Sequence, residues 1–261
     1  MFQRTLLRLY TRGLLPGGKR LLRRRVWTVE RGAGAGLKLR FPQNLDYVSG
    51  SSELPVQDAM AEHVKRDSVF YDVGANVGFF SLLAARLVGP GGRVYSFEPV
   101  SENAASVREN ARLSGLSNVT VHEVAVGSAA GNQELLLTAW DGGATLSTSV
   151  VKPPNPSGRR VVRLVALDDY IEAERLPAPQ FVKIDVEGAE LDVIDGMART
   201  IAEFRPSLLY EVDDGDRDRF ERRWTELDNR VTALGYRVSR LGQSYPNRNW
   251  FVGHSLARPA T

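Results

Sequence analysis

The residues VFYDVGANVGFFS, at 69–81, place an aspartate and two glycines between a short apolar run and a helix-like pattern. Gly74 and Gly78 permit a tight turn and a close approach of the backbone to a ligand. The helix that follows presents free backbone N–H groups in its first turn. Glu98 comes twenty residues after Gly78, at the end of the next apolar run, where a carboxylate can accept both hydroxyls of a ribose. The spacing therefore predicts a nucleotide-binding turn.

Three features of this turn bear on which nucleotide it binds. Asn76 stands where a dinucleotide-binding turn has its second glycine, the one that lets the backbone meet a pyrophosphate. Asp72 opposes the approach of phosphates, and no Lys or Arg lies within 71–85 to bind them. S-adenosylmethionine carries an ammonium and a sulfonium group, which suit carboxylates. The turn therefore favours S-adenosylmethionine, and the alternatives are NAD and an ordinary strand–helix turn.

A second group of carboxylates follows another predicted strand, in the segment KIDVEGAE at 183–190: Asp185, Glu187 and Glu190. Open α/β sheets bind ligands at the carboxyl ends of their strands. Acids crowded there repel one another and lose hydration unless a cation lies close, whether a cofactor, a metal ion or Lys183. The alternative is a structural role, since Glu187 and Glu190 in a first helical turn complement the helix dipole. We expect Asp185 to belong to the functional site.

The elements that position these residues alternate between short β-like runs and helical stretches. This rhythm predicts βαβ units and a mostly parallel sheet. Strands are expected over 69–73, 93–99, 119–127, 180–188, 206–212, 236–241 and 249–255, and helices over 53–65, 78–88, 102–115, 189–204 and 218–235. Residues 131–180 break the rhythm and read as a β-rich insertion with a Pro-rich loop, which either covers the ligand crevice or elaborates the surface.

The basic character of the chain belongs to its N-terminal segment. Residues 1–25 hold eight Lys or Arg and no acid, and the rest has 26 basic against 31 acidic side chains, so we expect no nucleic-acid footprint. We divide the 261 residues into a basic amphipathic segment, 1–40, and one main domain, 41–261. The segment suits an anionic membrane surface, with a transit peptide or a solvated terminus as alternatives. We expect a cytoplasmic protein, with association with a membrane surface through this segment as one of these alternatives.

The motifs DVGANVGFFS, SFEP and KIDVEGAE, at this spacing, resemble the FkbM family of S-adenosylmethionine-dependent methyltransferases over about residues 67–213. The resemblance implies a class I methyltransferase fold: an α/β, Rossmann-like sheet of seven mostly parallel strands with an antiparallel last strand, and helices on both faces. The final pair, 236–241 and 249–255, suits the terminal hairpin of that sheet. The implied reaction is O-methylation of a sugar, glycolipid, polyketide or other secondary metabolite. An NAD-dependent oxidoreductase and an inactive methyltransferase-fold binding protein are the alternatives.

We expect the cofactor to be S-adenosylmethionine, held at the ends of the first three strands and of the strand before Asp185. Glu98 is assigned to the ribose hydroxyls, and Glu123 to Ala125 to the edge of the adenine. Glu53, in the segment before the first strand, is a further candidate for the amino-acid end. The full set of expected cofactor residues is Asp72, Gly74, Ala75, Asn76, Gly78, Ser81, Glu98, Pro99, Glu123, Ala125 and Asp185.

A hydroxyl is a weak nucleophile until its proton leaves, so a base or a metal ion is expected beside the acceptor. Asp185, Glu187 and Glu211 are the catalytic candidates because all three end predicted strands or follow them directly. Asp185 and Glu211 together can hold Mg²⁺, which prefers oxygen ligands. The histidines are weaker candidates for the base: His63, His122 and His254. The expected acceptor is a small molecule or glycan, selected by the insertion.

Overall fold

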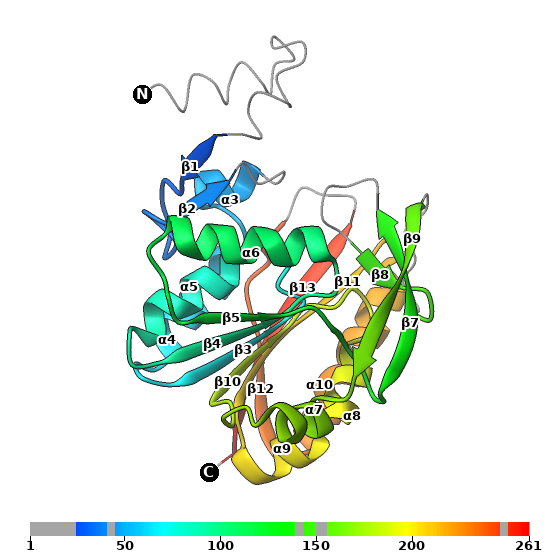
Figure 1. The fold of residues 1–261 in the computed structure, drawn as a ribbon. Coiled ribbons are helices and arrows are strands. Elements are labelled where there is room, and N and C mark those ends of the chain that lie inside the picture. Colours follow the sequence, from blue (N-terminus) through cyan, green and yellow to red (C-terminus); the bar gives the residue numbers. More distant parts are fainter. Residues whose placement is uncertain (1–24, 41–44, 139–143, 150–155, 246–249, 261) are drawn as a thin grey trace.

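A seven-stranded sheet forms the centre of the protein (Figure 1). The computed structural model describes residues 25–40, 45–138, 144–149, 156–245 and 250–260. Across the sheet the strands are β12 (Tyr236–Arg240), β13 (Phe251–Pro259), β11 (Ser207–Asp214), β10 (Phe181–Ile184), β3 (Val69–Val73), β4 (Arg93–Phe97) and β5 (Val119–His122). β13 is antiparallel to both of its neighbours, and the other pairings are parallel. The predicted sheet, with its terminal hairpin, is confirmed.

Helices cover both faces of this sheet, as expected (Figure 1). Successive residues of β3 serve opposite faces: Phe70 belongs to one buried cluster, and Tyr71 and Val73 belong to the other. The Phe70 face packs against α4 (Leu54–His63), α5 (Phe79–Val88) and α6 (Ser101–Leu113). The Tyr71 face packs against α7 (Leu167–Glu174), α8 (Glu190–Gly196), α9 (Ala198–Phe204) and α10 (Arg217–Ala233).

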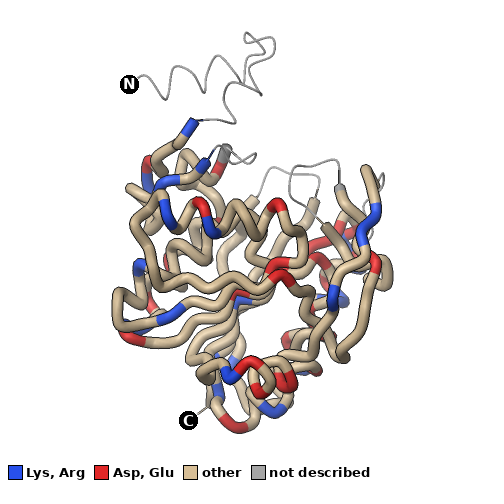
Figure 2. The backbone as a smooth tube through the Cα atoms, viewed as in Figure 1, with Lys and Arg blue, Asp and Glu red and all other residues tan. Residues whose placement is uncertain are grey.

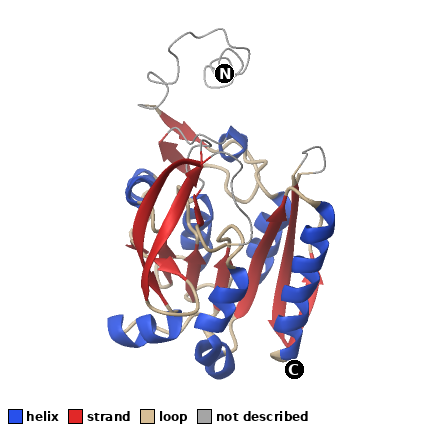
Figure 3. Cartoon of the chain, turned by 90° about the vertical axis from the view of Figure 1, so that its right-hand side faces the viewer, coloured by secondary structure: helices blue, strands red, loops and turns tan. Residues whose placement is uncertain are grey.

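A smaller second sheet occupies much of the range expected as a β-rich insertion (Figure 3). In order its strands are β6 (Ala125–Val126), β9 (Pro156–Val165), β7 (Gly131–Thr138) and β8 (Ala144–Leu146). Its buried side chains pack with Val100 and Ala189, which follow the carboxyl ends of β4 and β10. The second sheet therefore borders the end of the central sheet where a ligand is expected.

Two sequence-based boundaries inside these elements were wrong. The strand expected over 119–127 is interrupted after His122: β5 pairs with β4 in the central sheet, whereas β6 pairs with β9 in the second sheet. The insertion range also ends in helix, since α7 begins two residues after β9. Long-range pairing decided both boundaries, and a local apolar pattern does not report such pairing.

The helix expected over 189–204 is two short helices, α8 and α9, which meet at Met197. Gly196 ends α8 in close contact with another loop: a Cβ there would lie 2.0 Å from the carbonyl oxygen of Gly127. Asp168 of α7 then caps α9, since its carboxylate accepts 2.8 Å hydrogen bonds from the backbone N–H groups of Arg199 and Thr200. A new helix start supplied by a distant side chain explains the break.

The N-terminal part of the described chain packs on the main domain. β1 (Val26–Thr28) and β2 (Lys38–Arg40) form an antiparallel pair, and a short helix, α3 (Leu45–Ser49), follows. The Arg40 N–H donates to Asn110 Oδ1 of α6 at 2.7 Å. The part of the expected basic segment at 1–24 lies outside the described residues.

Acidic and basic residues are interspersed along the described chain (Figure 2). Within the described ranges, none of the helices is long and apolar enough to cross a membrane.

Candidate functional site

The turn between β3 and α5 has the left-handed backbone that its glycines permit. The φ angles of Gly74, Asn76 and Gly78 are 86°, 49° and 91°. A Cβ on Gly74 would lie 1.8 Å from the carbonyl oxygen of Asp185, so the turn touches the end of β10 directly. The first motif and the second therefore form one site, and glycine at position 74 is what allows them to meet.

Asp72 supplies a buried carboxylate beneath this turn. Its side chain is 1% exposed, and Oδ2 accepts a 2.5 Å hydrogen bond from the Ser81 hydroxyl. The Ser96 hydroxyl donates to Ser81 in turn, at 2.8 Å. The other oxygen, Oδ1, is buried without a hydrogen-bond partner, and burial raises the pKa of Asp72. Buried acceptors are usually paired, so this oxygen fits a ligand that brings a donor or a positive charge.

Glu98, at the end of β4, is tied to the same turn. Its carboxylate accepts hydrogen bonds from the backbone N–H groups of Asn76, at 2.8 Å, and Val100, at 2.9 Å. The Asn103 amide adds a third donor at 3.3 Å. Burial raises the pKa of Glu98 to about 7, against the opposing effect of these donors. The carboxylate is therefore held rigidly where the sequence placed the ribose contact.

The remaining expected cofactor residues divide into two groups. Gly74 and Ala75 donate backbone hydrogen bonds to the Phe97 carbonyl, and Pro99 directly follows Glu98, so Ala75 and Pro99 lie within the turn region. Glu123 instead forms a partly exposed ion pair with Arg108 at 2.7 Å. Ala125 is buried in the cluster beneath the second sheet. Gly74, Ala75 and Pro99 therefore lie at the turn with Asp72 and Glu98, whereas the contacts of Glu123 and Ala125 are with other parts of the protein.

Lys183 is the cation among the carboxylates at the end of β10. Its side chain is 3% exposed, donates to Asp185 Oδ2 at 2.7 Å, and lies over the Phe80 ring at 4.7 Å. In the sheet register it lies beside Asp72. Burial alone would lower the pKa of Lys183, but Asp185, Asp72 and further carboxylates raise it. The ammonium therefore stays charged and offsets part of the repulsion expected for this motif.

Glu187 and Glu190 have separate roles in the loop after β10. Glu187 has a left-handed backbone, φ 55°, and its carboxyl is hydrogen-bonded with Asp213. The charge of Asp213, followed by burial, raises the pKa of Glu187 well above its ordinary range. Glu190 accepts from the Gly188 N–H at 2.8 Å and from Arg223 at 3.0 Å. The contacts of Glu190, with a backbone N–H and an arginine, fit the structural role given above as an alternative. Glu187 instead lies near other acids.

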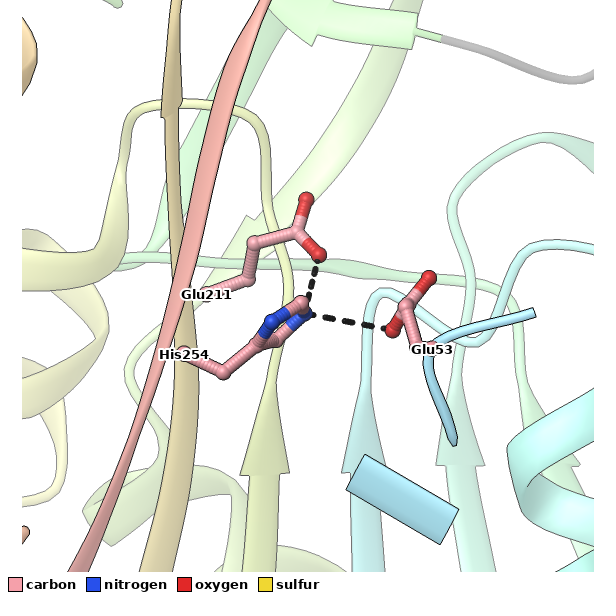
Figure 4. Close-up of side chains that lie close together, drawn as sticks. All are labelled: Glu53, Glu211 and His254. Atoms are coloured by element: carbon pink, nitrogen blue, oxygen red, sulfur yellow. Dashed lines mark hydrogen bonds and ion pairs between the residues drawn. The ribbon is translucent and has the colours of Figure 1, made fainter. Parts of the chain in front are cut away.

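Glu211 meets His254 and Glu53 in a compact cluster (Figure 4). His254 Nε2 lies 2.6 Å from Glu211 Oε2 and 3.2 Å from Glu53 Oε2. Burial, followed by the charge of Asp185, raises the pKa of Glu211 to about 8. Although burial opposes it, Glu211 raises the pKa of His254 to about 10, and His254 lowers that of Glu53. In the absence of another cation, a proton on His254 bridges the two carboxylates.

The expected pairing of Asp185 with Glu211 as metal ligands stays a prediction, and in the structure each of these carboxylates has a basic partner of its own. Among the described residues, Glu53, Glu211 and His254 are the group of three carboxylate or imidazole side chains whose ligand atoms all lie within 4.8 Å of one another. Asp185 is bound to Lys183 instead. By sequence alone, His254 is equivalent to the other two histidines as a candidate base. Its register opposite Glu211 distinguishes it, and that register follows from the antiparallel last strand.

The other two histidines lie away from this cluster. His63 is near the exposed Glu62 of α4, at 3.7 Å. His122 stacks on Phe97 and meets the Tyr170 hydroxyl at 3.0 Å. Neither residue contacts the carboxylates of the candidate site.

The chain is similar in sequence to known methyltransferases. The hexuronic acid methyltransferase AglP of Haloferax volcanii is 24% identical over 143 residues, which cover 54% of this chain and 55% of that protein. The 2-O-methyltransferase NoeI of Sinorhizobium fredii is 31% identical over 153 residues, covering 54% of this chain and 62% of that protein. The chain therefore spans somewhat more than half the length of these relatives.

A solved structure shares the fold. The crystal structure of methyltransferase FkbM from Methylobacillus flagellatus matches with a TM-score of 0.50 and 18% identity, over 77% of this chain and 50% of that one. The class I methyltransferase fold expected from the resemblance is confirmed, and the comparisons lend no support to an oxidoreductase. Since residues 72–238, well over half of the chain, match the methyltransferase FkbM domain, the chain belongs to that family.

Proposed function

We propose that the protein is an S-adenosylmethionine-dependent O-methyltransferase that acts on a hydroxyl of a sugar or of a related secondary metabolite. The observation that carries the proposal is the buried, unpaired Oδ1 of Asp72 beneath a glycine turn that also binds Glu98. Membership in the FkbM family supports the cofactor. The relatives named for a hexuronic acid and for 2-O-methylation support a sugar hydroxyl as the acceptor.

The residues present fit this cofactor better than a dinucleotide. Asp72, with its free oxygen, suits the positively charged end of S-adenosylmethionine, and Glu98 suits the ribose hydroxyls. Asn76 has the left-handed backbone that a glycine would have, and its N–H is already used by Glu98. That N–H is therefore not free to bind a pyrophosphate. When bound, S-adenosylmethionine supplies a methyl group carried on a positively charged sulfur.

Among the three catalytic candidates, Asp185 is best suited to take the proton of the acceptor hydroxyl. It is partly exposed and adjoins Gly74 of the cofactor turn, while Lys183 holds its orientation. Glu187 is less suited because the charge of Asp213, followed by burial, raises its pKa well above the ordinary range and so favours its protonated form. Glu211 is engaged by His254. We therefore assign the general base to Asp185 and a hydrogen-bond donor role to Glu187.

Calorimetric titration with S-adenosylhomocysteine tests the cofactor, with NADH as the control ligand. We expect micromolar binding of S-adenosylhomocysteine and no heat from NADH. Transfer of tritiated methyl to a panel of hexuronic acids, neutral sugars and macrolide alcohols then tests the acceptor. Binding of NADH alone would refute the proposal. Binding of S-adenosylhomocysteine with no transfer to any of these alcohols would leave the binding-protein alternative as the better account.

Asp185→Asn tests the assignment of the base. We expect the variant, assayed at saturating S-adenosylmethionine, to lose about 10²–10⁴-fold in methyl-transfer rate, the range typical of general bases. An unchanged rate would exclude Asp185 as the base.

A further inference from the structure

Three side chains from distant parts of the chain converge at one buried point: Glu53, Glu211 and His254 (Figure 4). We propose that they form a binding site for one divalent transition-metal ion, with Glu53 Oε2, Glu211 Oε2 and His254 Nε2 as ligands. The site differs from the magnesium pair expected from the sequence in two of its three ligands. It also includes a nitrogen donor, which alters the class of metal that suits it.

The backbone places the three ligand atoms independently of one another. Glu211 on β11 and His254 on β13 are direct partners in the antiparallel register, so their side chains leave the sheet side by side. Glu53 approaches from the start of α4 with a left-handed backbone, φ 44°. The three ligand atoms lie within 4.8 Å of one another.

Outer contacts orient two of the ligands toward their common point. The Ser244 hydroxyl lies 3.3 Å from His254 Nδ1, which leaves Nε2 turned toward the carboxylates. The Tyr245 hydroxyl donates to Glu53 Oε1 at 3.1 Å. Metal-binding histidines and carboxylates are commonly held in this way by hydrogen bonds to their other atoms. Ser244 and Tyr245 are consecutive residues, so one segment after β12 supports both ligands.

The environment of Glu53 Oε2 indicates that a ligand binds at this point. Glu53 is 6% exposed, and apart from the 3.2 Å approach of His254 this oxygen is buried without a hydrogen-bond partner. It is directed into the cluster, whereas Oε1 is taken by Tyr245. Ligand atoms about 2.0–2.2 Å from a zinc ion in tetrahedral arrangement lie about 3.3 Å apart. The Glu53–His254 distance already matches that separation, and the 2.6 Å Glu211–His254 contact has to widen slightly.

The donor set selects the class of metal. Two carboxylates and a neutral imidazole balance the charge of a divalent ion. Imidazole nitrogen suits zinc and the other late first-row metals, whereas magnesium prefers oxygen ligands and retains several waters. Three protein ligands leave at least one coordination position open, as in catalytic zinc sites. The donor set therefore favours Zn²⁺ over Mn²⁺ and Mg²⁺.

The role of the ion rests on the proposed function. Asp185, the proposed base, directly follows β10, whose last residue, Ile184, pairs with Tyr210 of β11, so its backbone lies beside that of Glu211. An acceptor hydroxyl bound at the open position would have its pKa lowered beside that base. The metal would also select an acceptor that offers two neighbouring oxygens, such as a sugar diol.

Metal binding is measured on the full-length protein after treatment with EDTA and dialysis. Isothermal titration with Zn²⁺, Mn²⁺ and Mg²⁺ compares the wild type with Glu53→Gln, Glu211→Gln and His254→Asn. Asp58→Asn is the matched control, since Asp58 is an exposed acid on the same helix as Glu53. We expect one equivalent of Zn²⁺ on the wild type and the control, and at least hundredfold weaker Zn²⁺ binding by each site variant. The wild type should bind Mn²⁺ and Mg²⁺ more weakly than Zn²⁺.

Thermal unfolding with and without metal verifies that each variant is folded. Absence of metal binding by the folded wild type would overturn the proposal and identify the cluster as a carboxylate–imidazolium bridge. The proposal would also be overturned if folded Glu53→Gln and Glu211→Gln bound Zn²⁺ as tightly as the wild type does. Because metal binding is read without cofactor, a protein that binds Zn²⁺ but not S-adenosylhomocysteine refutes the proposed function and leaves this site standing.

Discussion

Burial raises the pKa of the Glu98 carboxyl to about 7, so the group titrates near neutral pH. Its ordinary value is 4.5, so the protein retains the proton to a higher pH than the unfolded chain does. If the ionised form binds the ribose hydroxyls, protonation below pH 7 weakens cofactor binding. We expect the affinity for S-adenosylhomocysteine to fall about tenfold between pH 8 and pH 6, measured by calorimetry.

Glu98→Gln tests whether this residue causes the pH dependence. The amide does not titrate, so the variant should bind S-adenosylhomocysteine weakly and with a flat profile between pH 6 and pH 8. A profile in the variant as steep as that of the wild type would assign the titration to another group. Asp72 is the principal alternative, since burial raises its pKa also.

Gly74 has a close contact that Gly36 lacks, although their φ angles, 86° and 88°, are nearly the same. Gly74→Ala introduces a Cβ 1.8 Å from the Asp185 carbonyl, whereas Gly36→Ala meets nothing within 4 Å. We expect Gly36→Ala to cost about 1–2 kcal/mol for the backbone alone. Gly74→Ala should cost about 4 kcal/mol or more and abolish cofactor binding. Denaturant unfolding measures both, and equal losses would show that the turn and β10 are not in contact.

At the scale of elements, Arg223 joins α10 to α8 and to β11. Its guanidinium donates to Glu190 at 3.0 Å and to the Asp213 carbonyl at 2.7 Å, and lies 3.6 Å from Asp214. The side chains of Glu190 and Asp214 are 5% and 0% exposed. A buried carboxylate left without its partner is costly, so this arginine connects three elements around the loop that carries Glu187.

Arg223→Ala should therefore lower the free energy of unfolding by about 3–5 kcal/mol, the range for breaking a buried ion pair. Arg222→Ala, at the exposed neighbouring position of α10, is the control and should change stability by less than about 0.5 kcal/mol. Chemical denaturation at pH 7.5 compares the two. Similar losses for both variants would contradict the structural role assigned to Arg223.

At the scale of the whole molecule, charge is divided between the N-terminal segment and the rest. Residues 1–25 carry eight basic side chains, and the remainder has an excess of five acidic ones. We propose that this segment draws the protein to anionic membrane surfaces, where each Lys or Arg contributes about 1 kcal/mol. Such attraction should weaken as salt screens it.

Vesicle co-sedimentation tests this proposal with the full-length protein. The wild type should bind vesicles containing phosphatidylserine at low salt and should not bind neutral phosphatidylcholine vesicles. Replacement of Arg23, Arg24 and Arg25 by Gln should weaken binding about a hundredfold, from about 1 kcal/mol per residue. Equal binding to both kinds of vesicle, or no effect of the replacement, would exclude an electrostatic attachment.

The sequence by itself determined the nucleotide turn, the alternation of strands and helices, and the family. These are local properties: glycines at fixed spacing permit one turn, and hydrophobic periodicity separates strand from helix. Asp72, Asn76 and Glu98 are expected from the sequence alone, and in the structure Glu98 binds the backbone of Asn76 in the turn that follows Asp72. Element boundaries that depend on distant partners were not predicted, as in the break of the 189–204 helix by Asp168.

Only the tertiary structure decided the contacts among the acids. Glu53, Glu211 and His254 are separated by 158 and 43 positions in the sequence, and no local pattern relates them. Their meeting depends on the register of β13 against β11 and on where α4 begins. A one-residue shift in that register would turn His254 to the opposite face of the sheet. Long-range pairing thus decided which carboxylate meets another acid and which meets a histidine, whereas Lys183 and Asp185 meet within one strand end.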